Sequence, residues 1–168
     1  DECVDTLAQR FQLDPALIRR RSAEIYRQLP PANQLPFPAA PEVCAWIHAH
    51  NGLNIILTHR SLASTRALLD AHELTPLFSD IISTEQGYPC KPDPAMVFAA
   101  LKKHALNPAE TLLVGHRQID LQAGQAAGVS TCLFGAKEIS AQPDLRINSY
   151  ARLLAYLEER LNDEKGNK

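Results

Sequence analysis

The pattern of hydrophobic and polar positions between residues 41 and 161 alternates between two periods. Short apolar runs, which are typical of buried strands, separate longer segments in which apolar residues recur every three or four positions, as they do in helices. Strands are expected at 53–58, 78–84, 111–115, 130–135 and 145–149. Helices are expected at 41–50, 62–74, 91–106, 119–128 and 150–161. Strands that alternate with helices predict an α/β fold built on a parallel sheet.

The beginning and the end of the chain follow other rules. Residues 1–30 carry apolar side chains at helical spacing, and Asp14 followed by Pro15 predicts the start of a second helix. The segment 29–42 holds five of the twelve prolines and is expected to be an irregular linker. The polar residues 162–168 are expected to fray. We predict two domains, residues 1–35 and residues 36–168.

The composition excludes several classes of protein. Hydrophobic residues make up 45% of the 168 positions and charged residues 21%, which is typical of a globular protein. The formal net charge of −2 gives no electrostatic reason to expect nucleic acid or an acidic membrane as a partner. The longest apolar run, residues 53–57, is too short to cross a bilayer. We therefore expect neither nucleic acid nor membrane among the partners.

The four cysteines lie more than 40 residues apart, and none belongs to a C-x-x-C pair. Such scattered thiols indicate a protein of the reducing cytoplasm rather than a zinc or disulfide framework. The chain begins with Asp1 and no signal peptide is visible. We expect it to be a processed, truncated or partial product located in the cytoplasm.

Polar side chains follow three of the expected strands. They are Thr58, His59 and Arg60 after the first strand, Lys91 after the second, and His116 and Asp120 after the third. Because the carboxyl ends of parallel strands meet at one rim of the sheet, these side chains are expected to converge. A hydroxyl holds phosphate oxygens, a lysine neutralises their charge, and carboxylates bind Mg²⁺. The set predicts a site suited to phosphoryl transfer.

Residues 36–149 resemble the haloacid dehalogenase-like hydrolases of the phosphoglycolate phosphatase and β-phosphoglucomutase type, which carry a helical cap. The stretch PFPAAPEVCAWIHAHNGLNIILTHRS resembles the return of the chain from cap to core and the second family motif. The stretch GYPCKPDPAMVFAALKKHALNPAETLLVGHRQIDLQAGQAAGVST resembles the third and fourth motifs. The resemblance implies a Rossmann-like core in residues 36–168, with residues 1–35 as the remnant of the cap and a linker.

The resemblance also implies roles for the residues at the strand ends. Thr58 and Lys91 match the catalytic, phosphate-binding hydroxyl and lysine of the family, and His59 and Arg60 lie where substrate contacts are expected. Asp120 matches the second acid of the family's G-D-x-x-x-D pattern and is a candidate metal ligand. The implied activity is hydrolysis of a small phosphorylated metabolite with Mg²⁺, through attack of an aspartate on phosphorus.

Two departures from the family pattern put this activity in question. The D-x-D-x-T motif that carries the nucleophile is absent, since no two aspartates lie two residues apart. His116 replaces the first acid of the fourth motif and, as a metal ligand, suits Mg²⁺ poorly. In the family, the strand before D-x-D-x-T lies between the strands found here at 53–57 and 111–114. Its absence predicts unpaired edges and an apolar cleft, unless the two flanking strands close up.

Several alternatives remain open at this point. A missing N-terminal segment or a partner chain would complete the sheet, and without it we expect no phosphatase activity. The chain would then be a non-catalytic relic that binds phosphate or a partner. His116 and Asp120 could also form a pair that binds a transition metal. From another class, residues 6–21 resemble a helix-turn-helix, which would make the protein a DNA-binding regulator.

Overall fold

The computed structural model describes residues 2–136 and 138–166. These residues divide into two compact units, with the boundary between Leu35 and Pro36. We call the described residues up to Leu35 unit 1 and those from Pro36 onward unit 2. The irregular linker expected at residues 29–42 contains one 3₁₀ turn, and a helix begins at Ala40, inside the expected linker.

Unit 1 is helical. It consists of α1 (Glu2–Phe11), α2 (Pro15–Gln28) and the 3₁₀ turn η1 (Pro31–Asn33). The Asp14 carboxylate accepts a hydrogen bond of 2.9 Å from the backbone N–H of Ala16, so Asp14 is the N-cap of α2, as predicted. Val4 and Ala8 of α1 are buried, whereas Phe11 exposes 58% of its surface. The interpretation of unit 1 as a cap remnant stays a prediction.

Unit 2 confirms the predicted α/β fold with parallel strands. Its strands are β1 (Ile55–Thr58), β2 (Asp80–Ser83), β3 (Leu112–Gly115), β4 (Ser130–Phe134) and β5 (Leu145–Ile147). Its α-helices are α3 (Ala40–Ala49), α4 (Leu62–Ala71), α5 (Ala95–Lys103), α6 (Gln118–Ala126) and α7 (Tyr150–Gly166). The 3₁₀ turns η2 (Thr75–Leu77), η3 (Thr84–Gln86) and η4 (Pro108–Glu110) complete it. Each strand expected from the sequence is present.

Two helices differ from the sequence expectation at their ends. Helix α5 begins at Ala95 rather than at residue 91. The two prolines of the KPDP segment have no N–H, and the Asp93 carboxylate accepts the Ala95 N–H at 2.8 Å. Helix α7 continues to Gly166, so residues 162–166, expected to fray, are helical. Both differences follow from local end effects that hydrophobic spacing does not report.

The five strands form two sheets rather than one. Strand β1 pairs in parallel with β2, with Ile55 opposite Asp80. Strand β4 lies between β3 and β5 and is parallel to both. Among the described strands, no ladder joins β1 to β3. The two flanking strands have therefore not closed up, and a gap remains where the resemblance to the family implies that a strand is missing.

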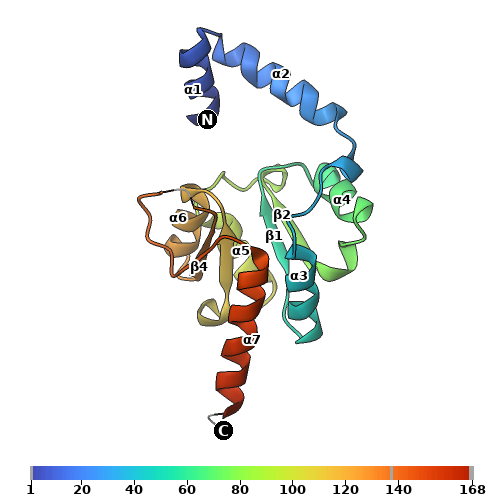
Figure 1. Ribbon diagram of the computed structural model, residues 1–168, viewed down its shortest axis with the longest axis vertical. Helices are drawn as coiled ribbons and strands as arrows, with labels where there is room; N and C mark the ends of the chain where they lie inside the picture. Colours follow the sequence, from blue (N-terminus) through green and yellow to red (C-terminus); the bar gives the residue numbers. More distant parts are fainter. Residues whose placement is uncertain (1, 137, 167–168) are drawn as a thin grey trace. The chain divides into compact units, whose positions relative to one another are not determined.

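Helices pack on both sheets of unit 2, and one of their buried clusters joins the two sheets. Helices α5 and α6 contribute one buried cluster, which consists of Val97, Leu101, Ala123, Ala127 and Val129. Leu57 of β1 and Leu113 of β3 both pack against this cluster, which therefore spans the two sheets. Helices α3 and α7 pack together, side by side in Figure 1, and cover Cys132 of β4 and Ile147 of β5. Apolar packing of α5 and α6 thus bridges the two sheets on one face of unit 2.

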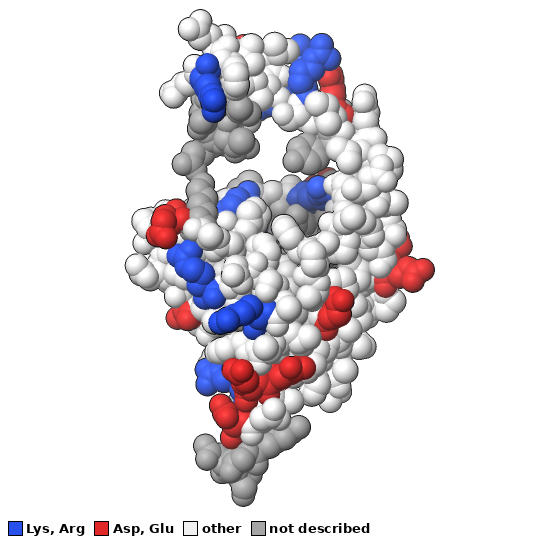
Figure 2. All heavy atoms as spheres, in the orientation of Figure 1, with Lys and Arg blue, Asp and Glu red and all other residues white. Residues whose placement is uncertain are grey.

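Neither the helices described here nor the face drawn in Figure 2 is dominated by one kind of side chain. Of the helices in the described part of the chain, none is both long enough and apolar enough to span a bilayer. On the face drawn in Figure 2, lysines and arginines stand in small separate groups among acidic and uncharged residues. The helix-turn-helix alternative for unit 1 remains a prediction that this face does not support.

The packing makes a prediction about stability. Leu133 of β4 is fully buried, so Leu133→Ala should lower the free energy of unfolding by about 2–5 kcal/mol. Leu53, 46% exposed beside the gap, is the matched control, and Leu53→Ala should cost less than about 1 kcal/mol. Urea unfolding followed by circular dichroism measures both. Equal losses would show that the gap is packed as tightly as the core.

Candidate functional site

A polar pocket of about 250 Å³ lies at the carboxyl ends of β1 and β3. Its lining residues are Leu57, Thr58, His59, Lys91, Val114, Gly115, His116, Arg117 and Asp120. The pocket therefore brings together side chains that the sequence places after three different strands. Arg60 is not among the lining residues, and Arg117 is a member that the sequence analysis did not identify.

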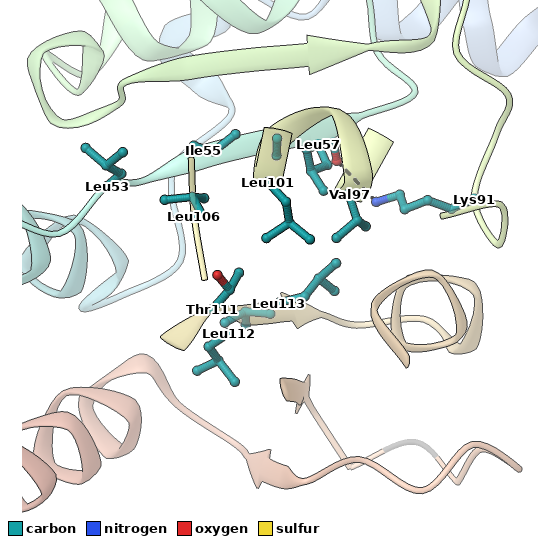
Figure 3. Close-up of a pocket in the computed structure, with 12 residues that line it drawn as sticks. Leu53, Ile55, Leu57, Lys91, Val97, Leu101, Leu106, Thr111, Leu112 and Leu113 are labelled. Carbon is teal, nitrogen blue, oxygen red and sulfur yellow. Dashed lines mark hydrogen bonds between the residues drawn. The ribbon is translucent and has the colours of Figure 1, made fainter. Parts of the chain in front are cut away.

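The shortest polar contact in the pocket joins Lys91 to Asp120. The Lys91 ammonium lies 2.6 Å from the Asp120 carboxylate, and the two side chains are only 10% and 4% exposed. The same ammonium donates a hydrogen bond of 3.1 Å to the backbone carbonyl of Leu57, drawn as a dashed line in Figure 3. Lys91 therefore connects β1 with α6, the helix that follows β3.

The backbone around Asp120 fixes the position of its carboxylate. Asp120 lies in the first turn of α6, and its side chain accepts a hydrogen bond of 3.1 Å from the Arg117 N–H. A Cβ at position 115 would overlap the Asp120 Cβ, so this strand end requires glycine. Burial raises the pKa of Asp120, but the hydrogen bond and charge of Lys91 and the charge of Arg117 outweigh it. The net result is a pKa below the ordinary value, so Asp120 is ionised at neutral pH.

His59 positions the backbone of Lys91. The Lys91 N–H lies 2.9 Å from the His59 Nε2, which must accept this hydrogen bond and so carries no proton. Partial burial and the charges of Lys91 and Arg117 lower the pKa of His59, against the opposite effect of Asp120. A neutral ring at neutral pH agrees with its role as acceptor. His59 therefore has a structural role that the sequence did not reveal, and its contact with substrate stays a prediction.

The two residues next to His59 have their own hydrogen bonds. The Thr58 hydroxyl oxygen accepts the Arg60 N–H at 2.9 Å, which orients that hydroxyl at the strand end. The Arg60 guanidinium lies 3.4 Å from the Ser64 hydroxyl on α4, and the Arg60 carbonyl accepts from the Ser83 hydroxyl at 2.7 Å. Thr58 is thus in place to contact a ligand, while substrate binding by Arg60 stays a prediction.

Arg117 adds a second cation to the pocket. Its side chain is 47% exposed, and its Nε lies 3.5 Å from the Asp120 carboxylate. Lys91 and Arg117 are both positive, and Asp120 is the single carboxylate among the described lining residues. With His59 neutral, the pocket therefore carries a surplus of positive charge. A basic residue directly before α6 at the strand rim was the sequence signal that could have identified Arg117.

The described residues do not fit a Mg²⁺ site. His116 is 67% exposed, and its Nδ1 lies 4.0 Å from the Asp120 carboxylate. Within residues 2–136 and 138–166, no group of three or more His, Cys, Asp or Glu side chains is placed to hold a metal ion. Mg²⁺ requires several oxygen ligands, and the carboxylate of Asp120 is already paired with Lys91. The proposed transition-metal pair of His116 and Asp120 likewise has no third ligand among these residues.

Comparison with known proteins identifies the family. The chain belongs to the haloacid dehalogenase-like hydrolases, whose family profile matches residues 5–134. A curated relative is the phosphoglycolate phosphatase of Aliivibrio fischeri, which is 29% identical over 127 residues. This match covers 72% of the chain and 56% of the relative. The phosphoglycolate phosphatase of Pseudomonas fluorescens strain Pf-5 is 30% identical over 93 residues, 34% of its length. The chain thus spans about half or less of these relatives.

Solved structures agree with the fold. A hydrolase of the same superfamily from Ehrlichia chaffeensis superposes with a TM-score of 0.66 at 18% identity, covering 94% of this chain and 73% of that chain. Another, of subfamily IA from Geobacter sulfurreducens, superposes with a TM-score of 0.64 at 20% identity over 73% of this chain and 61% of that chain. At such low identities the likeness concerns the fold alone.

The buried ion pair predicts a pH-dependent loss of stability in Lys91→Met. At pH 7 the variant leaves the buried, charged Asp120 with the contacts of Arg117 alone, and this loss should cost up to about 3–5 kcal/mol. Because the pKa of Asp120 is depressed in the folded protein, the pair stabilises above the unfolded pKa of about 4 and less at lower pH. The deficit of the variant should therefore shrink as the pH falls from 7 to below about 4, towards the depressed pKa at which Asp120 becomes protonated in the folded protein.

Urea unfolding at both pH values measures this loss. The matched control is Lys102→Met on α5, which removes an exposed lysine of the same length and should change little at either pH. A loss in Lys91→Met no larger than in the control, or one independent of pH, would show that the ion pair does not stabilise the fold.

Proposed function

We propose that this chain carries the phosphate-binding part of a phosphohydrolase site for a small phosphorylated metabolite, and that it has no phosphatase activity by itself. The observation that carries the proposal is the convergence of Thr58, Lys91 and Gly115 on one pocket with a surplus of positive charge. Membership of the hydrolase family and the phosphatase relatives give the reaction class.

The pocket has the chemistry that a phosphate group requires. The ammonium of Lys91 neutralises a phosphoryl oxygen, the Thr58 hydroxyl donates to another, and Arg117 adds a second cation at the exposed side. In phosphoryl transfer, positioning and charge neutralisation do most of the catalytic work. An arriving phosphate shares Lys91 with Asp120, whose carboxylate keeps the lysine directed into the pocket.

The described lining residues supply no nucleophile for the reaction. Asp120 is the single carboxylate among them, and both of its oxygens are engaged, by Lys91 on one side and by Arg117 on the other. Mg²⁺, which enzymes of this class generally use, finds one carboxylate here and an imidazole beside it. The pocket is therefore suited to hold a phosphate and incomplete for cleaving it.

A non-catalytic relic is the second candidate, and the unfilled gap between β1 and β3 favours it. In that case the same pocket serves to recognise a phosphate or a partner without turnover. Both candidates contain the anion site. They differ in whether the site would hydrolyse a bound phosphate once the missing carboxylates were supplied.

Binding of inorganic phosphate tests the anion site directly. We expect titration to shift the backbone amide signals of Thr58, Lys91 and Gly115 with a dissociation constant of about 1 mM or weaker. The measurement is a two-dimensional NMR titration at constant ionic strength. Lys91→Met should abolish the shifts and Lys102→Met should preserve them. Unmoved Thr58 and Lys91 amides at saturating phosphate would rule the site out.

The chain alone should not hydrolyse p-nitrophenyl phosphate in the presence of Mg²⁺. Loss of a nucleophile typically lowers the rate by several orders of magnitude, so turnover should not exceed that of the buffer. Continuous absorbance at high protein concentration measures the rate. Turnover that requires Mg²⁺ and disappears in Lys91→Met would reveal a nucleophile among residues that we have not assigned.

His116→Asp should strengthen Mg²⁺ binding by at least about fivefold, because the attraction between two unit charges about 4 Å apart is worth about 1 kcal/mol even in water-like surroundings. Calorimetric titration with Mg²⁺ measures the affinity of both proteins. The variant should still lack phosphatase activity, since no nucleophile has been added. Binding at least as tight with His116 as with the aspartate would contradict the view that His116 replaces a metal ligand.

A further inference from the structure

The turn that follows β1 and carries His59 is anchored to its surroundings at several points. The fully buried Ser83 hydroxyl at the end of β2 donates to the Arg60 carbonyl at 2.7 Å. Two residues further on, the Glu85 carboxylate accepts the Leu62 N–H at 2.8 Å. The backbone next to His59 is therefore tied to the end of β2 and to the 3₁₀ turn that follows it, which gives the imidazole a fixed base.

The segment that carries Lys91, residues 87–94 between η3 and α5, has fewer anchors. The Asp93 N–H donates to the Cys90 carbonyl at 3.2 Å, which is a contact inside the segment. In the described part of the chain, one hydrogen bond joins the backbone of residues 87–94 to β1, β2, β3 or the turn after β1. It is the bond of 2.9 Å from the Lys91 N–H to the Nε2 of His59, 32 residues earlier. His59 is thus the anchor of the Lys91 backbone.

The two ends of the Lys91 side chain are fixed by different groups. In Figure 3 this side chain extends from its segment towards β1, where its ammonium donates to the Leu57 carbonyl at 3.1 Å. The ammonium also contacts the Asp120 carboxylate at 2.6 Å. An adjoining cavity of about 150 Å³ is lined mainly by aliphatic side chains, which offer an ammonium no partner. The charge of Lys91 is therefore placed by two acceptors at its tip and by His59 at its backbone.

The hydrogen bond to Lys91 determines which protonation state of His59 is useful. Nε2 accepts only while it carries no proton, so the neutral ring holds its proton on Nδ1. The charged groups that line the same pocket are Lys91, Arg117 and Asp120, and the exposed imidazole of His116 lines it as well. Partial burial, Lys91 and Arg117 lower the pKa of His59, against the opposite effect of Asp120. The acceptor form therefore prevails at neutral pH.

This protonation state argues against a direct contact between Nε2 and an anion. A ring nitrogen without a proton presents a lone pair, which repels a phosphate oxygen rather than binding it. The lone pair of Nε2 is, moreover, already used by the Lys91 N–H. Any effect of Nε2 on anion binding must therefore pass through Lys91.

We propose that His59 is a positioning residue of the anion site: its Nε2 holds the Lys91 backbone where the ammonium reaches both Asp120 and a bound phosphate. Loss of this acceptor lowers phosphate affinity although no group that touches the phosphate is removed. The inference rests on the proposed function, because the anion concerned is the phosphate of that site.

Three substitutions of His59 separate positioning from other roles. Glutamine places a carbonyl oxygen as many bonds from Cα as Nε2, asparagine places it one bond short, and leucine offers no acceptor. Phosphate binding at about pH 7 should weaken about three- to tenfold in His59→Leu and His59→Asn, since one hydrogen bond is lost. His59→Gln should bind at least about threefold more tightly than His59→Leu. NMR titration with inorganic phosphate at constant ionic strength measures all three.

The control for these variants is His48→Leu, which replaces an exposed histidine on α3. It should bind phosphate like the unaltered chain. Circular dichroism checks that each variant is folded before its affinity is compared.

The unaltered chain supplies a second, spectroscopic test. Nitrogen-15 spectra near neutral pH should show a protonated Nδ1 and an unprotonated Nε2 for His59. On acidification, the Lys91 amide signal should move with the same midpoint as the His59 ring signals, below the ordinary histidine value of about 6.5. In His59→Gln the Lys91 amide should lose this transition. A ring that only fills space would not connect the two signals.

Four results would overturn the positioning role. They are a proton on Nε2 at neutral pH, a Lys91 amide that ignores the titration of His59, phosphate binding by His59→Leu as tight as by the unaltered chain, and binding by His59→Gln as weak as by His59→Leu. If His59→Leu does not fold, the spectra of the unaltered chain decide. Failure of the unaltered chain to bind phosphate would refute the proposed function and the affinity claim with it, whereas failure in the variants alone concerns His59.

Discussion

The ion pair between Lys91 and Asp120 is the constraint on which the architecture of the site depends. It spans the carboxyl ends of two sheets that share no ladder, and its 2.6 Å contact is almost shielded from water. Two charges in such a place are stable only together, because either one alone would be buried without a partner. The hydrogen bonds from Lys91 to Leu57 and from Arg117 to Asp120 complete the pair and attach it to both sheets.

This link joins the polar pocket to the apolar cavity between β1 and β3. Lys91 lines both cavities, so the group that neutralises an anion at the strand ends also closes the open edge of β1. A single side chain thus contributes both to the polar pocket at the strand ends and to the wall of the apolar cavity between the two sheets.

Much of this arrangement was predictable from the sequence, because strand order and polar strand ends decide which side chains converge. Thr58, Lys91 and Asp120 meet at one rim, as the alternating pattern predicts. The contact from the Lys91 N–H to His59, 32 residues earlier, was not predictable, since it depends on the path of a proline-containing loop. Arg117 was missed because its role comes from the start of α6. The persistence of the gap depends on helices that pack across both sheets, which no local pattern encodes.

Because no ladder joins β1 to β3, we infer that the two strands remain apart by about the width of one strand. Adjacent strands lie about 4.8 Å apart, so β1 and β3 should be separated by about 10 Å. Nuclear Overhauser effects between backbone protons of the free chain measure this most directly. We predict cross-strand signals between Ile56 and Ile81 and between Leu113 and Thr131, which are paired, and none between β1 and β3. Signals that join Ile55 or Leu57 to Leu112 or Val114 would show that the sheet has closed and would contradict the account.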